Sequence, residues 1–504
     1  MKTIPVTRPI RPVLLASCCA CLLSCAVGPN FKQPGPPPVS GYTLEPLNAG
    51  TTSGGLPAGA SPRFVVGMDI PGEWWALFHS PPLNHLVEEA LHNNPTIDAA
   101  QKALVVAREN VAAQKGSYYP SVTANFTPSY NKTATGSLSP ASASGNPYYT
   151  LYTAQLTVNF VPDVFGVNRR TVESLQAQAD SQRFQVEATY LTLSSNVVTA
   201  AIQEALLRGQ IQANQEIVKE ETEALTILKR QLELGQVAGA DVAAQEALLA
   251  QAQAALPPLQ KQLDQQRDLL NALVGHFPSE DIGATFNLEG FELPRSLPVT
   301  IPARLLEQRP DVRMAVEQLH SASAEVGVAI GNLLPSISLS ANGGKAVNYF
   351  SQFFGPGTLY WTLAASITQP IFEGGTLIHR ERAARAAYEQ SLALYRSAVV
   401  TALQNVADAL RALQSDSTAV AVAANAERTA NTSLEITRKQ LALGQVAYLN
   451  LLTAQQAYQS ALNNLIQARA TRLSDTAALF QALGGGWWNR VDVAGTRVAQ
   501  DGTR

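Results

Sequence analysis

Cysteine is almost absent from this chain of 504 residues: its four cysteines all lie in the first 25 residues, and the rest of the sequence has none. An exported protein of this composition would therefore have no disulfide bond within its body. The six histidines are scattered and form no His-Glu-x-x-His arrangement, and none accompanies the cysteine cluster. A zinc centre is not expected, and the sequence predicts no cofactor.

Charged residues are also scarce. They make up 15% of the chain, the formal net charge is −3, and no long basic run is present, so nucleic acid is not an expected partner. The sequence contains neither a Gly-x-Ser-x-Gly nucleophile turn nor a phosphate-binding loop. Because no pattern places reactive side chains together, we expect that the protein is not an enzyme.

The N-terminus has the features of an export signal. Residues 1–24 combine a basic start, a short apolar run and small residues, and the run is too short to span a membrane. The sequence Leu22-Leu-Ser-Cys25 resembles the site at which bacterial lipoproteins are cleaved and acylated. Cys18 ends a similar tetrapeptide after a shorter apolar run, so we predict lipidation at Cys25, with an ordinary cleaved signal peptide as the alternative. Several acyl chains would hold the protein to a membrane durably.

An internal repeat organises the rest of the chain. The sequence Leu-Glu-Leu-Gly-Gln-Val-Ala at residues 232–238 is matched by Leu-Ala-Leu-Gly-Gln-Val-Ala at residues 441–447. Prolines in similar settings recur with nearly the same offset, for example Pro95 and Pro310. The chain is thus predicted to hold two copies of a unit of about 210 residues, which is the size of a domain.

The repeat sets the expected domain boundaries. An extended, lipidated N-terminal segment rich in proline, glycine and serine is predicted over residues 25–70. The first structural repeat follows at residues 71–285 and the second at residues 286–488. Each repeat is expected to hold a helix, a β-hairpin and a long helical hairpin. Residues 489–504 are predicted to be a disordered tail.

Alternating apolar and polar residues predict one β-hairpin in each copy. Val122, Ala124 and Phe126 alternate with polar residues in the first copy, and the second copy repeats this pattern from Ile337. Four strands cannot close a barrel, because membrane barrels have at least about eight strands and unpaired strand edges are costly in a bilayer. Three chains would together supply twelve strands, an allowed even number.

Each copy also contains a helix of unusual length. Residues 164–234 and 374–443 contain no proline, and about 70 helical residues would extend roughly 105 Å. Both stretches end at Leu-Gly-Gln-Val, where the glycine predicts a tight turn. A returning helix of about 34 residues follows in each copy. Pro257 and Pro258 are expected to kink or break the first returning helix early.

Short motifs distributed from Cys25 to Trp487 add a resemblance. They are Cys25-Ala-Val-Gly-Pro-Asn-Phe, Trp74-Trp75 with Phe78, Asp163-Val-Phe-Gly, Leu305-Leu-Glu-Gln-Arg-Pro-Asp-Val-Arg, Gln369-Pro-Ile-Phe-Glu-Gly-Gly and Ala482-Leu-Gly-Gly-Gly-Trp. Each motif is weak alone, but together they are highly specific. In this order they resemble the outer-membrane factor family, the TolC-like exit ducts of tripartite efflux pumps, and most closely its lipoprotein branch of OprM and NodT type.

The resemblance implies a mainly α-helical protein with membrane β-structure. It implies a homotrimer whose twelve strands form an outer-membrane β-barrel and whose long helices form an α-helical periplasmic barrel, closed at its far end. The protein would be anchored in outer-membrane lipid, span that membrane and extend into the periplasm. Its partners would be a periplasmic adaptor, or membrane fusion protein, and an inner-membrane pump of the RND type.

The resemblance also suggests site residues. The two turns would lie at the periplasmic tip and contact the α-hairpins of an adaptor, although a tip must turn in any case. In TolC-like ducts an acidic residue lies beside a leucine about nine positions before the tip glycine, which here gives Leu434 and Glu435, with Arg438 one helical turn on. Three copies of Glu435 would favour cations at this gate, with a solvated helix face as the alternative. The candidate tip residues are Leu234, Gly235, Gln236, Val237, Leu443, Gly444, Gln445 and Val446.

These expectations define one function and two rivals. We expect a duct that passively conducts small molecules such as drugs from the adaptor and pump to the exterior, with the pump supplying the energy. A duct for type I secretion of proteins or peptides would have the same fold. A periplasm-spanning structural lipoprotein without a pore is a rival of another class, and the alternating hairpins argue against it.

Overall fold

The computed structural model describes most of the chain. The described residues are 26–39, 41–43, 63–132, 147–294 and 296–490. The predicted signal peptide and Cys25 therefore lie outside the described residues. Within the described ranges, no helix is both long and apolar enough to cross a membrane.

The chain divides into two compact units, and each draws on separate stretches of sequence. Unit 1 takes its described residues from 1–34, 104–182 and 315–395. Unit 2 takes its described residues from 35–103, 183–314 and 396–504. Unit 1 holds the strands of the two hairpins, and unit 2 holds both turns that join a long helix to its returning helix.

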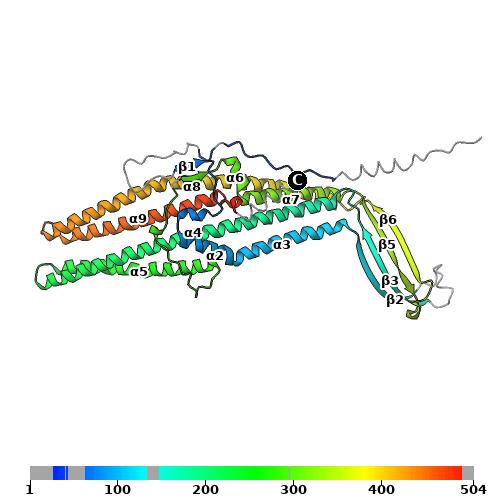
Figure 1. Cartoon of the computed structure of the whole chain (residues 1–504), viewed down its shortest axis with the longest axis horizontal. Helices are drawn as coiled ribbons and strands as arrows, with labels where there is room; N and C mark the ends of the chain where they lie inside the picture. The colour runs from blue at the N-terminus through cyan, green and yellow to red at the C-terminus, as the bar shows by residue number, and fades with distance from the viewer. Residues whose placement is uncertain (1–25, 40, 44–62, 133–146, 295, 491–504) are drawn as a thin grey trace, which may run out of the picture. The chain divides into compact units, whose positions relative to one another are not determined.

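Both copies of the repeat contain the same order of elements (Figure 1). Two helices precede each hairpin and are separated at Pro95 or Pro310, because the residue before a proline is disfavoured in the helical conformation. The long helices α4 and α8 each contain 67 residues, which corresponds to about 100 Å. The first copy is α2 (Pro81–Asn93), α3 (Pro95–Lys115), β2 (Ser121–Lys132), β3 (Tyr148–Phe160), α4 (Val167–Glu233) and α5 (Gly239–Val274), and the second is α6 (Pro302–Gln308), α7 (Pro310–Gly331), β5 (Ser336–Val347), β6 (Leu359–Thr368), α8 (Thr376–Ala442) and α9 (Tyr448–Ala482).

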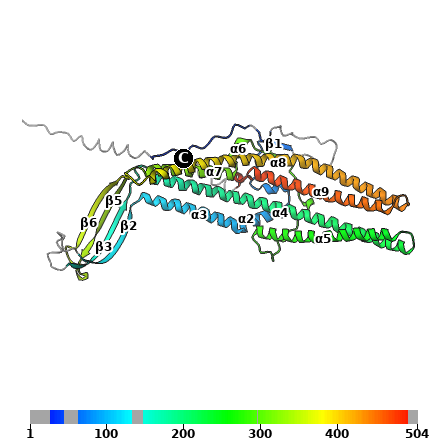
Figure 2. The same cartoon turned by 180° about the vertical axis from the view of Figure 1, so that it is seen from behind.

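Within unit 2, the returning helix α5 lies beside α4, and the returning helix α9 lies beside α8 (Figure 1, Figure 2). The side chain of Gln266 on α5, for example, donates a hydrogen bond to the carbonyl of Ala200 on α4. Helix α5 continues through Pro257 and Pro258, so of the predicted kink or break, the break is wrong and the kink stays a prediction. Both prolines are exposed, where water can bond the carbonyls that lose their helical partners.

In unit 1, the two predicted hairpins join into one antiparallel sheet with the strand order β2-β3-β5-β6. The central pairing joins the copies: Leu156 of β3 lies opposite Gly343 of β5 and, on its other side, opposite Ala124 of β2. Among the described residues, the outer edges of β2 and β6 pair with no strand. The sheet is therefore open on both sides within a single chain.

The two faces of this sheet differ in polarity, because side chains directly opposite each other on paired strands point to the same face. On one face, large apolar side chains are exposed, and on the other, hydroxyl and amide side chains predominate. Alternation of this kind is typical of membrane-barrel strands. The apolar face includes Val122, Phe126, Leu156, Leu339, Leu359, Trp361, Leu363 and Ile367, and the polar face includes Thr123, Asn125, Thr127, Thr157, Asn342, Thr362 and Ser366.

The core of unit 2 is built around buried aromatic rings. Trp74 and Phe78 of the short helix η1 (Trp74–Phe78) are fully buried, and Trp74 stacks on Phe480 of α9 with ring centroids 5.5 Å apart. Residues from the two ends of the sequence thus meet in one hydrophobic cluster. Trp74 therefore contributes to the core of unit 2.

The folded body extends beyond the boundaries expected at residues 71 and 488. Strand β1 (Arg63–Val66) pairs in parallel with β4 (Ser296–Val299), an interaction that the composition of the N-terminal segment did not reveal. At the other end, the Asn489 side chain donates a hydrogen bond to the carbonyl of Ile70 at 2.7 Å, and Arg490 forms an ion pair with Glu187. The remainder of the predicted tail, residues 491–504, lies outside the described residues.

The aromatic core predicts a large, local effect of one substitution. Trp74→Ala removes a buried ring and leaves a cavity, which should lower the free energy of unfolding by about 3–5 kcal/mol. Trp361→Ala is the matched control, because this ring is exposed in unit 1 and its loss should cost less than about 1 kcal/mol. Denaturant unfolding of the detergent-solubilised protein measures both, and equal effects would contradict the assignment of Trp74 to the core.

Candidate functional site: the helical tips and the contact between α4 and α8

Both predicted turns close in the same way. Gly235 and Gly444 have φ angles of 69° and 72°, in the left-handed region that favours glycine. The amide of Gln236 donates to the carbonyl of Gln231, and that of Gln445 to the carbonyl of Gln440, each at 2.9 Å. A hydrogen bond from the sixth residue back to the first is characteristic of the Schellman motif, which ends helices. A Cβ at either glycine would meet nothing within 4 Å, so the backbone conformation, not crowding, requires glycine.

The turns carry apolar side chains that the described residues leave largely exposed. Leu234 is 59% exposed and Leu443 is 71% exposed. Next to them Val237 and Val446 are half-buried, in equivalent positions of the two copies. Exposed apolar residues grouped at the end of a helical hairpin are characteristic of an interaction surface.

The three predicted gate residues have different environments. Leu434 is only 2% exposed and packs inside the chain, so it supports its neighbour but presents little surface. The Glu435 side chain is half exposed, and its Oε1 accepts a hydrogen bond from Arg438 Nη1 at 3.1 Å, the expected i,i+3 pair. Arg438 Nη2 also bonds Glu220 Oε2 of α4 at 2.6 Å. One arginine therefore links the two long helices.

A second contact joins the two helical hairpins next to this ion pair. The Gln245 amide on α5 donates to the carbonyl of Glu221 at 3.0 Å and to its carboxylate. The Tyr448 hydroxyl on α9 donates to Gln245 Oε1 at 2.6 Å. Burial of the Glu221 carboxyl raises its pKa above the ordinary value. The hairpin α4–α5 is thus tied to the hairpin α8–α9 by Arg438–Glu220 and Tyr448–Gln245.

These ties are modest in energy. A partly exposed ion pair is worth about 0.2–1 kcal/mol, and a neutral hydrogen bond about 1 kcal/mol. The two ties together contribute about 1–2 kcal/mol to the contact between the hairpins, in addition to the hydrophobic cluster that α4, α5, α8 and α9 share.

Several of these residues were not predicted from the sequence. No sequence motif includes Glu220, Glu221, Gln245 or Tyr448. The repeat gave no signal either: the position equivalent to Glu435 in the first copy is Thr226, so the two copies differ at this site. The partner of Arg438 depends on how two hairpins pack. Among the described residues, no group of three or more His, Cys, Asp or Glu side chains is arranged to hold a metal ion.

The fold is that of a known family. The family model described as outer membrane efflux protein matches residues 86–276 and 301–485, which fall within the two copies of the repeat. The chain therefore belongs to the outer membrane efflux protein family. It is an outer-membrane channel with a periplasmic extension, and not an enzyme.

Known proteins are similar to this chain over nearly its whole length. The pyoverdine export outer membrane protein OpmQ of Pseudomonas putida is 26% identical over 435 residues, covering 86% of this chain and 92% of OpmQ. Nodulation protein T of Rhizobium leguminosarum bv. trifolii is 26% identical over 479 residues, covering 94% of this chain and 97% of its own. The solved outer-membrane channel OprN superposes with a TM-score of 0.81 at 25% identity, covering 92% of this chain and 100% of OprN. The predicted resemblance is confirmed.

The tie through Arg438 can be tested by local opening. Arg438→Met should increase hydrogen exchange in residues 430–442 of α8 and 216–226 of α4 by about two- to fivefold, because one inter-helix contact is lost. Arg428→Met is the matched control: Arg428 lies on the same helix, and its side chain donates a hydrogen bond to Asn425 of that helix. If both variants exchange alike, Arg438 does not tie the helices.

Proposed function

We propose that this chain forms the outer-membrane exit duct of a tripartite efflux system of the RND type. It would passively conduct small molecules such as drugs from a periplasmic adaptor and an inner-membrane pump to the exterior. The observation that carries the proposal is the pair of equivalent tip turns, each with an exposed leucine, at the ends of helices of 67 residues. Two equivalent contact points per chain suit an adaptor that binds repeatedly around a tube.

The duct is proposed to be a homotrimer. The open edges of β2 and β6 and the exposed apolar face of the sheet support this, because a bilayer requires every strand edge to be paired. Three copies would close a barrel of twelve strands, with apolar side chains towards lipid and polar side chains towards the lumen. The same three-fold arrangement would bring three copies of Glu435 together at the periplasmic gate.

The anchor and the repeat complete the proposal. Removal of residues 1–24 would leave an acylated Cys25 at the start of the mature chain, followed by two structural repeats with the boundaries refined above. The similar proteins are named for different cargoes: pyoverdine for OpmQ, toluene for TtgC of Pseudomonas putida and cations for CusC of Escherichia coli. This variety supports a duct whose cargo is selected by the pump, so the nature of the small molecule is a property of the whole system.

Deletion of the gene tests the proposed cargo class. Cells that lack it should retain more of at least one class in a panel of dyes, antibiotics, organic acids and metal ions, and a plasmid copy should restore export. Unchanged retention together with loss of a secreted protein from the medium would overturn small-molecule efflux in favour of type I secretion.

The tips predict a specific loss of partner binding. Changing both Leu234 and Leu443 to Asp should abolish chemical crosslinking to the adaptor and raise compound retention to the level of the deletion strain, because charge replaces two exposed apolar contacts. Leu269→Asp is the control, since this leucine is exposed on α5 away from the turn. Wild-type crosslinking by the double variant would show that the adaptor binds elsewhere.

The gate predicts a change in ion selectivity. Glu435→Ala should raise single-channel conductance and reduce cation preference in planar bilayers, because the ring of carboxylates is removed. Glu427→Ala removes an acidic residue from the same helix and should leave both properties unchanged. If Glu435→Ala behaves like Glu427→Ala, Glu435 does not line the constriction.

A further inference from the structure

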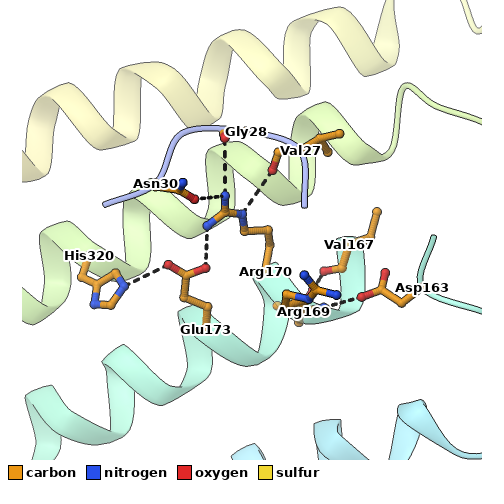
Figure 3. Close-up of polar contacts among 10 residues, drawn as sticks. Val27, Gly28, Asn30, Asp163, Val167, Arg169, Arg170, Glu173 and His320 are labelled. Carbon is orange, nitrogen blue, oxygen red and sulfur yellow. Dashed lines mark hydrogen bonds and ion pairs between the residues drawn. The ribbon is translucent and has the colours of Figure 1, made fainter. Parts of the chain in front are cut away.

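A buried arginine in the first turn of α4 holds the segment that follows Cys25 (Figure 3). Arg170 is 4% exposed, and its Nε donates to the carbonyl of Val27 at 3.1 Å. Its Nη2 donates to Asn30 Oδ1 at 2.7 Å and to the carbonyl of Gly28 at 3.4 Å. Its Nη1 is paired with Glu173 at 2.7 Å. Most of the donors on this buried guanidinium are therefore satisfied by the N-terminal segment.

The same segment is held at both of its ends. The amide of Val27 donates to the carbonyl of Phe165 at 3.1 Å, just before α4. The ring of Phe31 stacks on His320 of α7, with centroids 4.4 Å apart and an angle of 12°. Glu173 connects Arg170 to α7. Its Oε2 pairs with Arg170, and its Oε1 bonds His320 Nε2 at 3.0 Å (Figure 3). Without residues 27–31, the buried charge of Arg170 would lose most of its partners, which is costly.

The backbone contacts fit this segment closely. Gly28 has a φ of +94°, and a Cβ on it would lie 2.5 Å from Gly327 Cα on α7. A Cβ on Gly327 would in turn lie 2.9 Å from Cγ of Arg170. Because Gly28 and Gly327 have no side chains, residues 27–31, α7 and Arg170 can lie in close contact. At the start of the segment, Ala26 lies against Gly166, where a Cβ would be 2.7 Å from Ala26 Cα.

We propose that Arg170 is the positioning residue of the lipid anchor. By clamping residues 26–31, it fixes Ala26, the residue that follows the proposed attachment point, beside Gly166, between β3 and α4. Cys25 itself lies outside the described residues and is joined to Ala26 directly along the chain. This inference rests on the proposed acylation of Cys25 and on the proposed membrane-spanning sheet.

The position has a consequence for the membrane. β3 ends at Phe160 and β5 begins at Ser336, so the clamp lies beside the strand ends from which α4 and α7 extend. If the sheet spans the outer membrane, the acyl chains enter the inner leaflet directly beside the barrel. If Cys18 were acylated instead, residues 18–24 would add up to about 25 Å of chain between the lipid and Cys25. The position of residues 26–31 would then no longer determine where the acyl chains enter the membrane.

Hydrogen exchange tests the clamp itself. In the purified wild-type protein, the amide of Val27, which donates to the carbonyl of Phe165, should be protected, and Arg170→Met should make it exchange at least about tenfold faster. Asn30→Ala should act in the same direction from the segment side, without removing the buried charge. Arg169→Met is the matched control, because Arg169 is exposed and only its backbone amide bonds Asp163. Equal exchange in wild type and Arg170→Met would overturn the clamp.

A double-mutant comparison tests whether the clamp acts through the lipid. The leader and Cys25 are replaced by an ordinary cleavable signal peptide, and the appearance of heat-resistant oligomer in cells is followed by pulse-chase. Arg170→Met should slow assembly of the acylated protein at least roughly threefold and leave assembly of the lipid-free protein unchanged. Equal slowing of both proteins would mean that Arg170 only stabilises the fold, and would overturn the positioning role.

The mass of the mature N-terminal peptide separates failure of the clamp from failure of the anchor. An unmodified peptide, or acylation at Cys18, would remove the anchor that Arg170 is proposed to position, whatever the exchange result. Acylation at Cys25 with an unprotected Val27 amide would leave the anchor intact and remove the clamp. Acylation at Cys25 with protection that depends on Arg170 is the expected result.

Discussion

The open edges of the four-stranded sheet are the constraint on which the rest of the architecture depends. β2 and β6 each present a row of backbone groups that pair with no strand among the described residues, and one face of the sheet is covered with exposed apolar side chains. Water could satisfy those edges but not that face, whereas lipid suits the face but leaves the edges unsatisfied. Only pairing with further copies satisfies both. Such pairing would also cover apolar residues that a single chain exposes along α8, namely Val400, Val422 and Ile436.

The proposed closure of the sheet by several chains would bring the helical hairpins of those chains together. Each long helix turns back at a glycine in the left-handed conformation, so the chain delivers two equivalent ends. The two hairpins of one chain are joined by Arg438–Glu220 and Tyr448–Gln245, which are contacts of modest strength. These polar contacts add to the hydrophobic cluster that both hairpins share.

The sequence predicted what depends on periodicity and repetition, and missed what depends on packing between distant segments. The duplicated order of elements, the lengths of α4 and α8 and the glycine turns all follow from local pattern, and each is present. Pro257 and Pro258 misled the prediction, because an exposed helix can continue past proline when water takes the freed carbonyls. The pairing of β1 with β4 and the contact of Arg438 with Glu220 join residues with no shared motif, so no local signal could reveal them.

At the candidate site too, local sequence pattern predicted some contacts, and packing between distant segments determined the others. Glu435 and Arg438 are one turn apart, and their pairing was foreseeable from helical spacing. The burial of Leu434 was not, because it depends on the neighbouring helices. The clamp at Arg170 joins a short N-terminal motif to helices far along the chain, and only the folded structure relates them.

Native mass spectrometry of the protein released from membranes in mild detergent tests the central claim most directly. The account predicts a species of three chains, because three copies supply the strands that close the barrel and cover the open edges. A monomer or dimer that still conducts ions in planar bilayers would contradict it.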